Sequence, residues 1–158
     1  MTEIVKGTAA RRPVQTRPKP VDPVLAMLGL TATIRSSLEL VFVIRKGLPY
    51  TSLQRVSTEL DLPVVVTGLS LGLVGRTIAR RIQKKEPLTP EESERVVRLA
   101  RVLGKAVEVL GSLAKARRWV RKPSRALGGA APLTMLDTGI GSNAVLRELG
   151  RIDHGVFA

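Results

Sequence analysis

The chain of 158 residues contains no cysteine, a single histidine, and only one Trp, one Tyr and two Phe. Without cysteine it has no disulfide framework, no thiolate metal site and no cysteine nucleophile. A catalytic zinc needs three protein ligands, and His154 with scattered carboxylates is a poor source of them. Because aromatic residues favour β-sheets, their scarcity favours an aliphatic, helical core. The composition therefore disfavours an enzyme and predicts no cofactor, metal or small-molecule substrate.

Long apolar runs are also missing. The most apolar segment, residues 38–44, contains Glu39 and is far shorter than the roughly 20 apolar residues of a membrane-spanning helix. The first 24 residues lack the apolar stretch of a secretory signal. We therefore expect a cytoplasmic protein that does not enter a membrane. An apolar fraction of 44% is ordinary for a folded chain of one domain or two small ones.

What the chain has in excess is positive charge. It carries 26 Lys and Arg against 13 Asp and Glu, a formal net charge of +13. Such an excess raises the affinity for polyanions without setting a sequence preference. Nucleic acid is the leading candidate partner, and an anionic membrane surface is the second.

The first 22 residues have a composition unlike the rest. They hold five basic residues and three prolines, and proline prevents a continuous helix by fixing φ and removing a hydrogen-bond donor. We predict a disordered basic arm over residues 1–22. It either tethers the protein to DNA or is a solubilising leader, and the sequence does not separate the two.

Apolar residues recur at spacings of three and four along the remaining chain, which predicts an all-α fold. In the segment 23–46, interrupted at Gly29, the spacing predicts a buried face that includes Leu38, Val41 and Phe42. The β-branched run 64–66 favours a strand instead, but no partner strand is visible nearby. Further helices are expected over residues 51–60, 63–70, 74–84, 112–121 and 143–152, with short turns over 124–129 and 132–137.

The clearest helix start in the sequence is at Thr89. Thr89 can cap the helix, Pro90 suits its first position, and Glu92 completes a capping box. The helix should end near Gly111. Its arginines are offset by glutamates, so we interpret this helix as structural rather than as a nucleic-acid-binding element.

Residues 67–85 have the pattern of a helix-turn-helix. Gly68 allows two helices to cross closely, Gly72 follows in the tight turn, and Ile78 anchors the second helix six residues later. That second helix has an apolar face to hold it and a basic face for phosphates and guanine edges. The alternative is an ordinary solvated surface helix. The predicted DNA-binding residues are Arg76, Thr77, Arg80, Arg81, Lys84 and Lys85.

From Leu48 to the end, the sequence resembles the Xre/MbcA/ParS family of antitoxins. The stretches that carry the resemblance are GRTIARRIQKKEPLTPEESERVVRLARV (75–102), ARRWVRKPSRALGGAAPLTMLDTGIG (116–141) and LRELGRIDHGVFA (146–158). Val120 departs mildly from the leucine usual in the family. The matching positions in the second half are Ala116, Trp119, Val120, Pro123, Ala126, Leu127, Gly128, Gly129, Pro132, Leu133, Leu136, Asp137, Thr138 and Gly141.

This resemblance implies an Xre-like helix-turn-helix half for operator binding and dimerisation, which we place at residues 23–110, and a small helical toxin-binding half at 111–158. It further implies an antitoxin that inhibits a RES-domain, NAD-consuming toxin and represses the shared operon. We expect a homodimer, because recognition helices usually read paired half-sites. The segment 23–46 is the expected dimer surface, since it is more apolar than one short chain can easily cover.

By analogy with the family, the tail from Gly155 to Ala158 is predicted to plug the active-site cleft of the toxin. An apolar segment ending in a carboxylate suits such a cleft, because the carboxylate can pair with arginines that would otherwise hold a cofactor phosphate. The alternative is that the tail folds back onto its own core. Trp119 has a preferred interpretation as a core anchor and a second one as an interface residue. The predicted toxin-binding residues are Trp119, Arg151, His154, Gly155, Val156, Phe157 and Ala158.

A rival hypothesis is a general basic DNA-binding regulator or nucleoid-associated protein. It would explain the net charge but not the residues at 119–141. The basic cluster beside Trp119 is equally open, because it can face either an acidic toxin surface or water. Its members are Arg117, Arg118, Arg121, Lys122 and Arg125.

Overall fold

The computed structural model describes residues 22–31 and 34–155 of the chain. Within these ranges it contains helices and no strand, which confirms the predicted all-α class. None of these helices is both long and apolar enough to cross a bilayer. The elements are α1 (Pro23–Leu28), α2 (Ser37–Lys46), α3 (Tyr50–Leu60), α4 (Val64–Ser70), α5 (Gly75–Lys84), α6 (Pro90–Leu110), α7 (Leu113–Arg121), the 3-10 helices η1 (Arg125–Leu127) and η2 (Pro132–Met135), and α8 (Gly139–Asp153).

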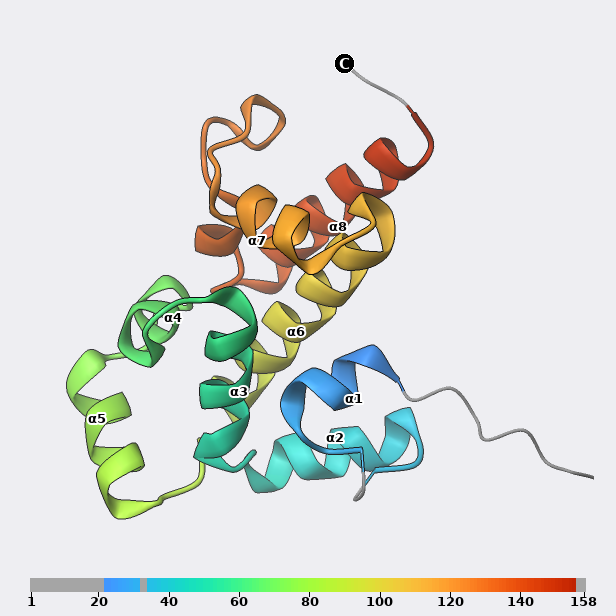
Figure 1. The fold of residues 1–158 in the computed structure, drawn as a ribbon. Helices are drawn as coiled ribbons and strands as arrows, with labels where there is room; N and C mark the ends of the chain where they lie inside the picture. Colours follow the sequence, from blue (N-terminus) through green and yellow to red (C-terminus); the bar gives the residue numbers. More distant parts are fainter. Residues whose placement is uncertain (1–21, 32–33, 156–158) are drawn as a thin grey trace, which may run out of the picture.

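The long helix α6 is the centre of the molecule (Figure 1). Its 21 residues span about 30 Å. Helices α1, α2 and α3 pack on it toward one end, and α7 and α8 toward the other. Leu99, Leu103 and Ala106 are fully buried along it. One continuous core thus runs the length of α6, and each fully buried leucine contributes roughly 2 kcal/mol of transfer free energy.

The ends of α6 follow from local chemistry. The hydroxyl of Thr89 accepts a hydrogen bond from the Glu92 backbone N–H at 3.1 Å, and the Glu92 carboxylate accepts one from the Thr89 N–H at 2.8 Å. Pro90 occupies the first turn, and Gly111 ends the helix with a φ of 85°. The capping box and the helix end predicted from the sequence are both confirmed.

The predicted helical segment 23–46 is instead two helices. Gly29 adopts a φ of 72° and ends α1, and α2 begins only after Ser36. The predicted buried face is confirmed at Leu25 and Leu28 of α1 but is wrong for three residues of α2. Leu40 is buried, whereas Leu38, Val41 and Phe42 are 65%, 40% and 58% exposed.

The connection from α2 to α3 is pinned beside the start of α6. The Leu48 N–H donates to the Ser93 hydroxyl at 2.8 Å, and the Leu48 carbonyl accepts from the Leu88 N–H at 2.8 Å. Gly47 precedes this contact with a φ of 99°, and a Cβ there would lie 2.2 Å from the Leu88 carbonyl oxygen. Only glycine satisfies both conditions.

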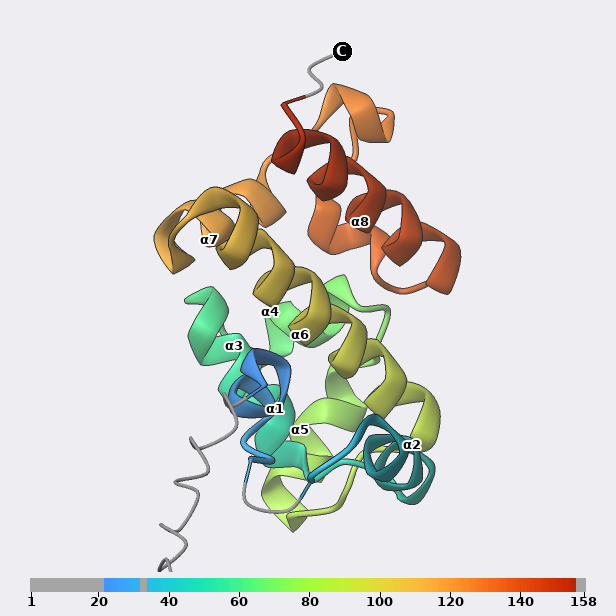
Figure 2. The ribbon, with the colours of Figure 1, turned by 90° about the vertical axis from the view of Figure 1, so that its right-hand side faces the viewer.

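Helices α7 and α8 lie at the same end of α6 (Figure 2). Helix α8 begins at Gly139, four residues before the predicted start. Thr138 caps it by accepting the Gly141 N–H at 3.1 Å. A Cβ on Gly141 would lie 2.0 Å from the Met135 carbonyl oxygen, so the first turn of α8 packs directly on η2.

Candidate nucleic-acid interface and toxin-binding half

The crossing of α4 and α5 has the geometry of a helix-turn-helix. Gly68 on α4 lies so close to α5 that a Cβ there would be 2.1 Å from Ile78 Cδ1. Ile78 is buried, and Gly72 in the connecting turn has a φ of 73°. The three residues that predicted the motif from their spacing therefore occupy the three expected positions.

The outer face of α5 is basic. Arg76, Arg80 and Lys84 are exposed and follow one another at intervals of four residues, so they lie along one side of the helix. The Arg80 guanidinium lies 3.6 Å from the Glu86 carboxylate but remains 52% exposed. Gln83, which the sequence analysis did not select, is exposed on the same side.

Two further predicted DNA-binding residues lie at the margins of this face. Thr77 is half-buried. Lys85 follows the last turn of α5 and is exposed, with a left-handed φ of 54° that ends the helix. Both remain within reach of a ligand that covers α5.

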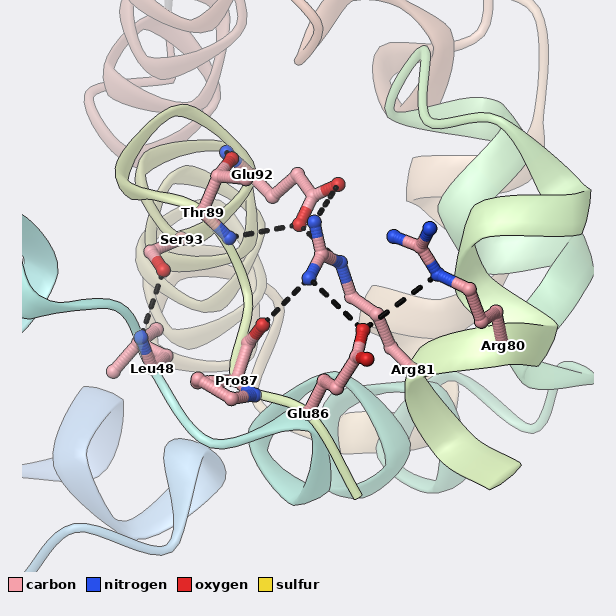
Figure 3. A network of polar contacts seen from close by, with 8 residues as sticks. All are labelled: Leu48, Arg80, Arg81, Glu86, Pro87, Thr89, Glu92 and Ser93. Carbon is pink, nitrogen blue, oxygen red and sulfur yellow. Dashed lines mark hydrogen bonds and ion pairs between the residues drawn. The ribbon is translucent and has the colours of Figure 1, made fainter. Parts of the chain in front are cut away.

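Arg81 does not share that face, contrary to the expectation from its spacing. Its side chain is only 13% exposed and turns toward the start of α6 (Figure 3). Nη1 donates to the Pro87 carbonyl at 2.8 Å, and Nε forms an ion pair with Glu92 Oε2 at 2.8 Å. Arg81 therefore fastens α5 to α6, and the same carboxylate that caps α6 holds it.

The arginines of α6 also bind backbone. Arg95 Nη1 donates to the carbonyls of Leu71 and Gly72, at 3.3 and 3.0 Å, and so holds the turn of the helix-turn-helix. Arg98 donates to the Asp137 carbonyl at 3.3 Å, just before α8. These placements agree with the structural role expected for α6.

In the second half, Trp119 is half-buried against the core beside the fully buried Val120, which fits its interpretation as a core anchor. Arg117 donates from Nε to the Glu59 carbonyl and ties α7 to the end of α3. The other four members of the basic cluster are exposed: Arg118, Arg121, Lys122 and Arg125.

The end of α8 is held on α6 by a lysine between two carboxylates. The Lys105 ammonium lies 2.9 Å from the carboxylate of Glu108 and 3.8 Å from that of Asp153. The hydrogen bond to Glu108 raises the pKa of Lys105 above its ordinary value, with the nearby carboxylates adding to the shift against desolvation. Lys105 therefore stays charged at neutral pH.

An open hollow of about 550 Å³ lies between η1 and α8. Arg151 and His154 line it, and so does Glu148, which forms an ion pair with Arg151. The His154 ring Nδ1 lies 2.7 Å from the Gly150 carbonyl oxygen, so this ring packs on the last turn of α8. Two predicted toxin-binding residues thus meet at one hollow. Gly155 follows with a φ of 68°, and Val156, Phe157 and Ala158 lie outside the described residues.

Comparison with known proteins identifies both halves. Residues 39–101 match the model of the antitoxin Xre-like helix-turn-helix domain, and residues 105–155 match that of the antitoxin Xre/MbcA/ParS C-terminal toxin-binding domain. An antitoxin Xre of Photorhabdus laumondii is 33% identical over 73% of this chain and 79% of its own length. The chain belongs to the Xre family of antitoxins. The resemblance in the sequence is thereby confirmed.

Two further relatives are also antitoxins that match most of the chain. An antitoxin Xre of Yersinia enterocolitica is 32% identical over 75% of this chain and 81% of its own length. A Sphingobium protein named Prs ADP-ribosylating antitoxin is 31% identical over 78% of this chain and 83% of its own length. The family accounts for the residues at 119–141, which a general nucleic-acid-binding protein does not explain. The boundary between the two matched domains falls inside α6.

Proposed function

We propose that this antitoxin neutralises a RES-domain toxin with its C-terminal half and represses its own operon through α5, acting as a homodimer. One observation carries the proposal: α5 and α8 lie at opposite ends of the fold (Figure 1), with the basic face on the first and the hollow beside the second. A duplex and a toxin can therefore be bound at the same time.

For operator binding, we assign Arg76 and Arg80 to base edges in the major groove. Thr77, Lys84 and Lys85 are assigned to phosphates, and the arm at residues 1–22 to further phosphates. Arg81 is left out because its ion pair with Glu92 and its exposure of 13% keep it from the groove. This division predicts different salt dependences, because only phosphate contacts release counterions.

The second copy in the homodimer is assigned to the outer face of α2. This short helix is apolar on both sides, with Leu40 turned to the core and Leu38 and Phe42 turned to solvent. Exposed apolar patches of this kind often mark contacts with another protein. Two α2 helices packed face to face would cover both outer faces and pair two recognition helices for two half-sites.

For the toxin, we assign Arg151, His154 and the segment after α8 to the inhibitory contact, with Trp119 supporting them from the core. The hollow between η1 and α8 supports this assignment, because Arg151 and His154 line it. The relative named for ADP-ribosylation supports an NAD-consuming toxin, since ADP-ribose is taken from NAD.

The operator assignment is tested by fluorescence anisotropy on the operon's promoter over a range of salt concentrations. We expect Arg80→Ala to cost about 1–3 kcal/mol of binding free energy, concentrated at one base pair of each half-site. Lys84→Ala should weaken all duplexes alike and reduce the salt slope by about one. Unchanged affinity in the Arg80→Ala variant would contradict the assignment of α5.

The toxin assignment is tested by co-expression with the adjacent toxin gene and measurement of cellular NAD. Deleting residues 155–158 should release NAD depletion while leaving operator binding intact. Arg80→Ala is the matched control, because it should weaken DNA binding and leave inhibition complete. Full inhibition by the truncated chain would exclude the tail as the inhibitory element.

The dimer assignment is tested by sedimentation of the full chain at micromolar concentration. Phe42→Lys should convert a dimer to a monomer, because it places two charges in the middle of the apolar contact. Val65→Lys on α4 is the control and should leave the dimer intact. A wild-type monomer would contradict the assignment.

A further inference from the structure

The residue just before α5 is a valine, whereas α3 and α4, which also begin without a side-chain capping bond, follow a proline. Val74 is the N-cap, makes no side-chain capping bond, and is 66% exposed. Valine is among the poorest N-cap residues, because it has no oxygen to accept the free N–H groups of the first turn. Five other helices of the described chain begin with a side chain that does so: Asp22, Ser36, Thr89, Ser112 and Thr138.

The next residue also goes unexplained by the fold. Gly75 opens α5 without a left-handed φ, and a Cβ there would meet Val65 and Leu69 only at ordinary contact distances of 3.5 and 3.7 Å. Neither space nor backbone conformation requires glycine at this position. Glycine does allow the backbone to come close to a ligand. Two consecutive residues that disfavour the helix start are typical of a surface that serves binding rather than folding.

The chemistry of the neighbours indicates what this surface meets. Arg76 follows directly on α5, and Arg80 extends the same basic side. In a helix-turn-helix, the N-terminal residues of the recognition helix contact base edges. The major groove offers one apolar group among its hydrogen-bonding atoms, which is the 5-methyl group of thymine. We propose that Val74 reads thymine, by packing its side chain against that methyl group in each half-site of the operator.

This inference rests on the proposed operator binding and adds a residue that determines its specificity. Arg76 and Arg80 are hydrogen-bond donors suited to guanine. A valine at the start of the same helix adds an apolar contact that these two arginines do not supply. The preferred half-site should therefore contain a thymine next to the base pairs read by the arginines.

The experiment begins with the full chain and a random duplex library, from which the preferred sequence is selected. Each thymine of that duplex is then replaced in turn by uracil, which lacks only the methyl group. For the wild-type protein, we expect one thymine in each half-site whose replacement raises the dissociation constant about fourfold, the effect of one buried methyl group. Replacing any other thymine by uracil should leave the dissociation constant unchanged.

The decisive variant is Val74→Ser, which removes the apolar contact and restores an N-cap oxygen. It should bind the thymine operator about sixteenfold more weakly, because the contact is lost in both half-sites, and should not distinguish uracil from thymine at the sensitive position. Its melting temperature should rise by about 2–4 °C, because serine caps the helix. The matched control is Val66→Ser, another exposed valine, which should retain the wild-type sensitivity to uracil.

The outcomes separate this proposal from the one on which it rests. A selected operator that is insensitive to uracil at every position would overturn the role of Val74 and leave operator binding standing. The same holds if Val74→Ser keeps the uracil effect or melts well below the wild type, since the valine would then serve the fold. Failure to select any duplex would overturn both proposals.

Discussion

Helices α5 and α6 follow each other in the chain and carry three arginines each, but these arginines have different surroundings. On α5, Arg76 and Arg80 point to solvent. On α6, Arg95 and Arg98 donate to backbone carbonyls of other segments. An arginine is thus available to a ligand where its intramolecular partners leave it exposed: Arg80 remains 52% exposed beside Glu86, whereas Arg81 is 13% exposed beside Glu92. Arg81 is on α5 but belongs with the second group.

The largest difference in stability is expected between alanine variants of the two neighbouring arginines of α5. Arg81→Ala should lower the free energy of unfolding by about 2–3 kcal/mol, because it leaves Glu92 charged and largely buried without its ion-pair partner. Arg80→Ala should change it by less than about 0.5 kcal/mol. Urea denaturation followed by circular dichroism measures both. Equal losses of unfolding free energy in the two variants would contradict a structural role for Arg81 that Arg80 does not share.

A second prediction concerns the clamp on the turn between α4 and α5. Arg95→Met keeps the length of the side chain but removes both hydrogen bonds to the Leu71 and Gly72 carbonyls. We expect a loss of about 1.5 kcal/mol in the free energy of unfolding. Hydrogen exchange at the amides of this turn should accelerate more than at those of α8, and uniform acceleration would contradict a local clamp.

The cap of α6 should matter less. Thr89→Ala removes the hydroxyl that accepts the Glu92 N–H, and we expect a cost of about 1 kcal/mol in the free energy of unfolding. Thr89→Ser keeps the hydroxyl and should cost less than about 0.5 kcal/mol. Thermal unfolding of the two variants provides the check, and a serine variant as unstable as the alanine one would exclude capping as the cause.

The smallest effect is expected at the third arginine of α6. Arg101 is exposed, and its replacement by alanine should leave the free energy of unfolding within about 0.5 kcal/mol of the wild-type value. Operator affinity should also stay unchanged. A loss comparable to that of Arg95→Met in urea denaturation would show that the position of an arginine on α6 does not decide its contribution.

Local patterns predicted the parts of this fold that local chemistry determines. The spacing of Gly68, Gly72 and Ile78 located the helix crossing, and Thr89 with Glu92 located the start of α6. In each case, residues within ten positions of one another make the contact. Contacts of this kind can be predicted from residue spacing without knowing how segments distant in the sequence pack together.

The incorrect predictions concern contacts that the spacing of apolar residues does not encode, whether the partner is near or far in the sequence. Arg81 turns away from the basic face of α5 because Glu92 and the Pro87 carbonyl accept hydrogen bonds from its guanidinium. Phe42 is exposed because α2 turns Leu40 to the core, and the apolar spacing alone does not show which side of this helix is buried. The early start of α8 depends on a close approach of Gly141 to Met135.

The course of α6 through both matched domains has a consequence for recombination between relatives. A swap of toxin specificity at the boundary near residue 104 would cut a single helix whose buried side chains, such as Leu99 and Ala106, serve both sides. A chimera would inherit one half of that helix from each parent. It would fold only where the two parents have compatible side chains along the buried face of α6. The choice of toxin partner and the choice of operator are therefore expected to be inherited together.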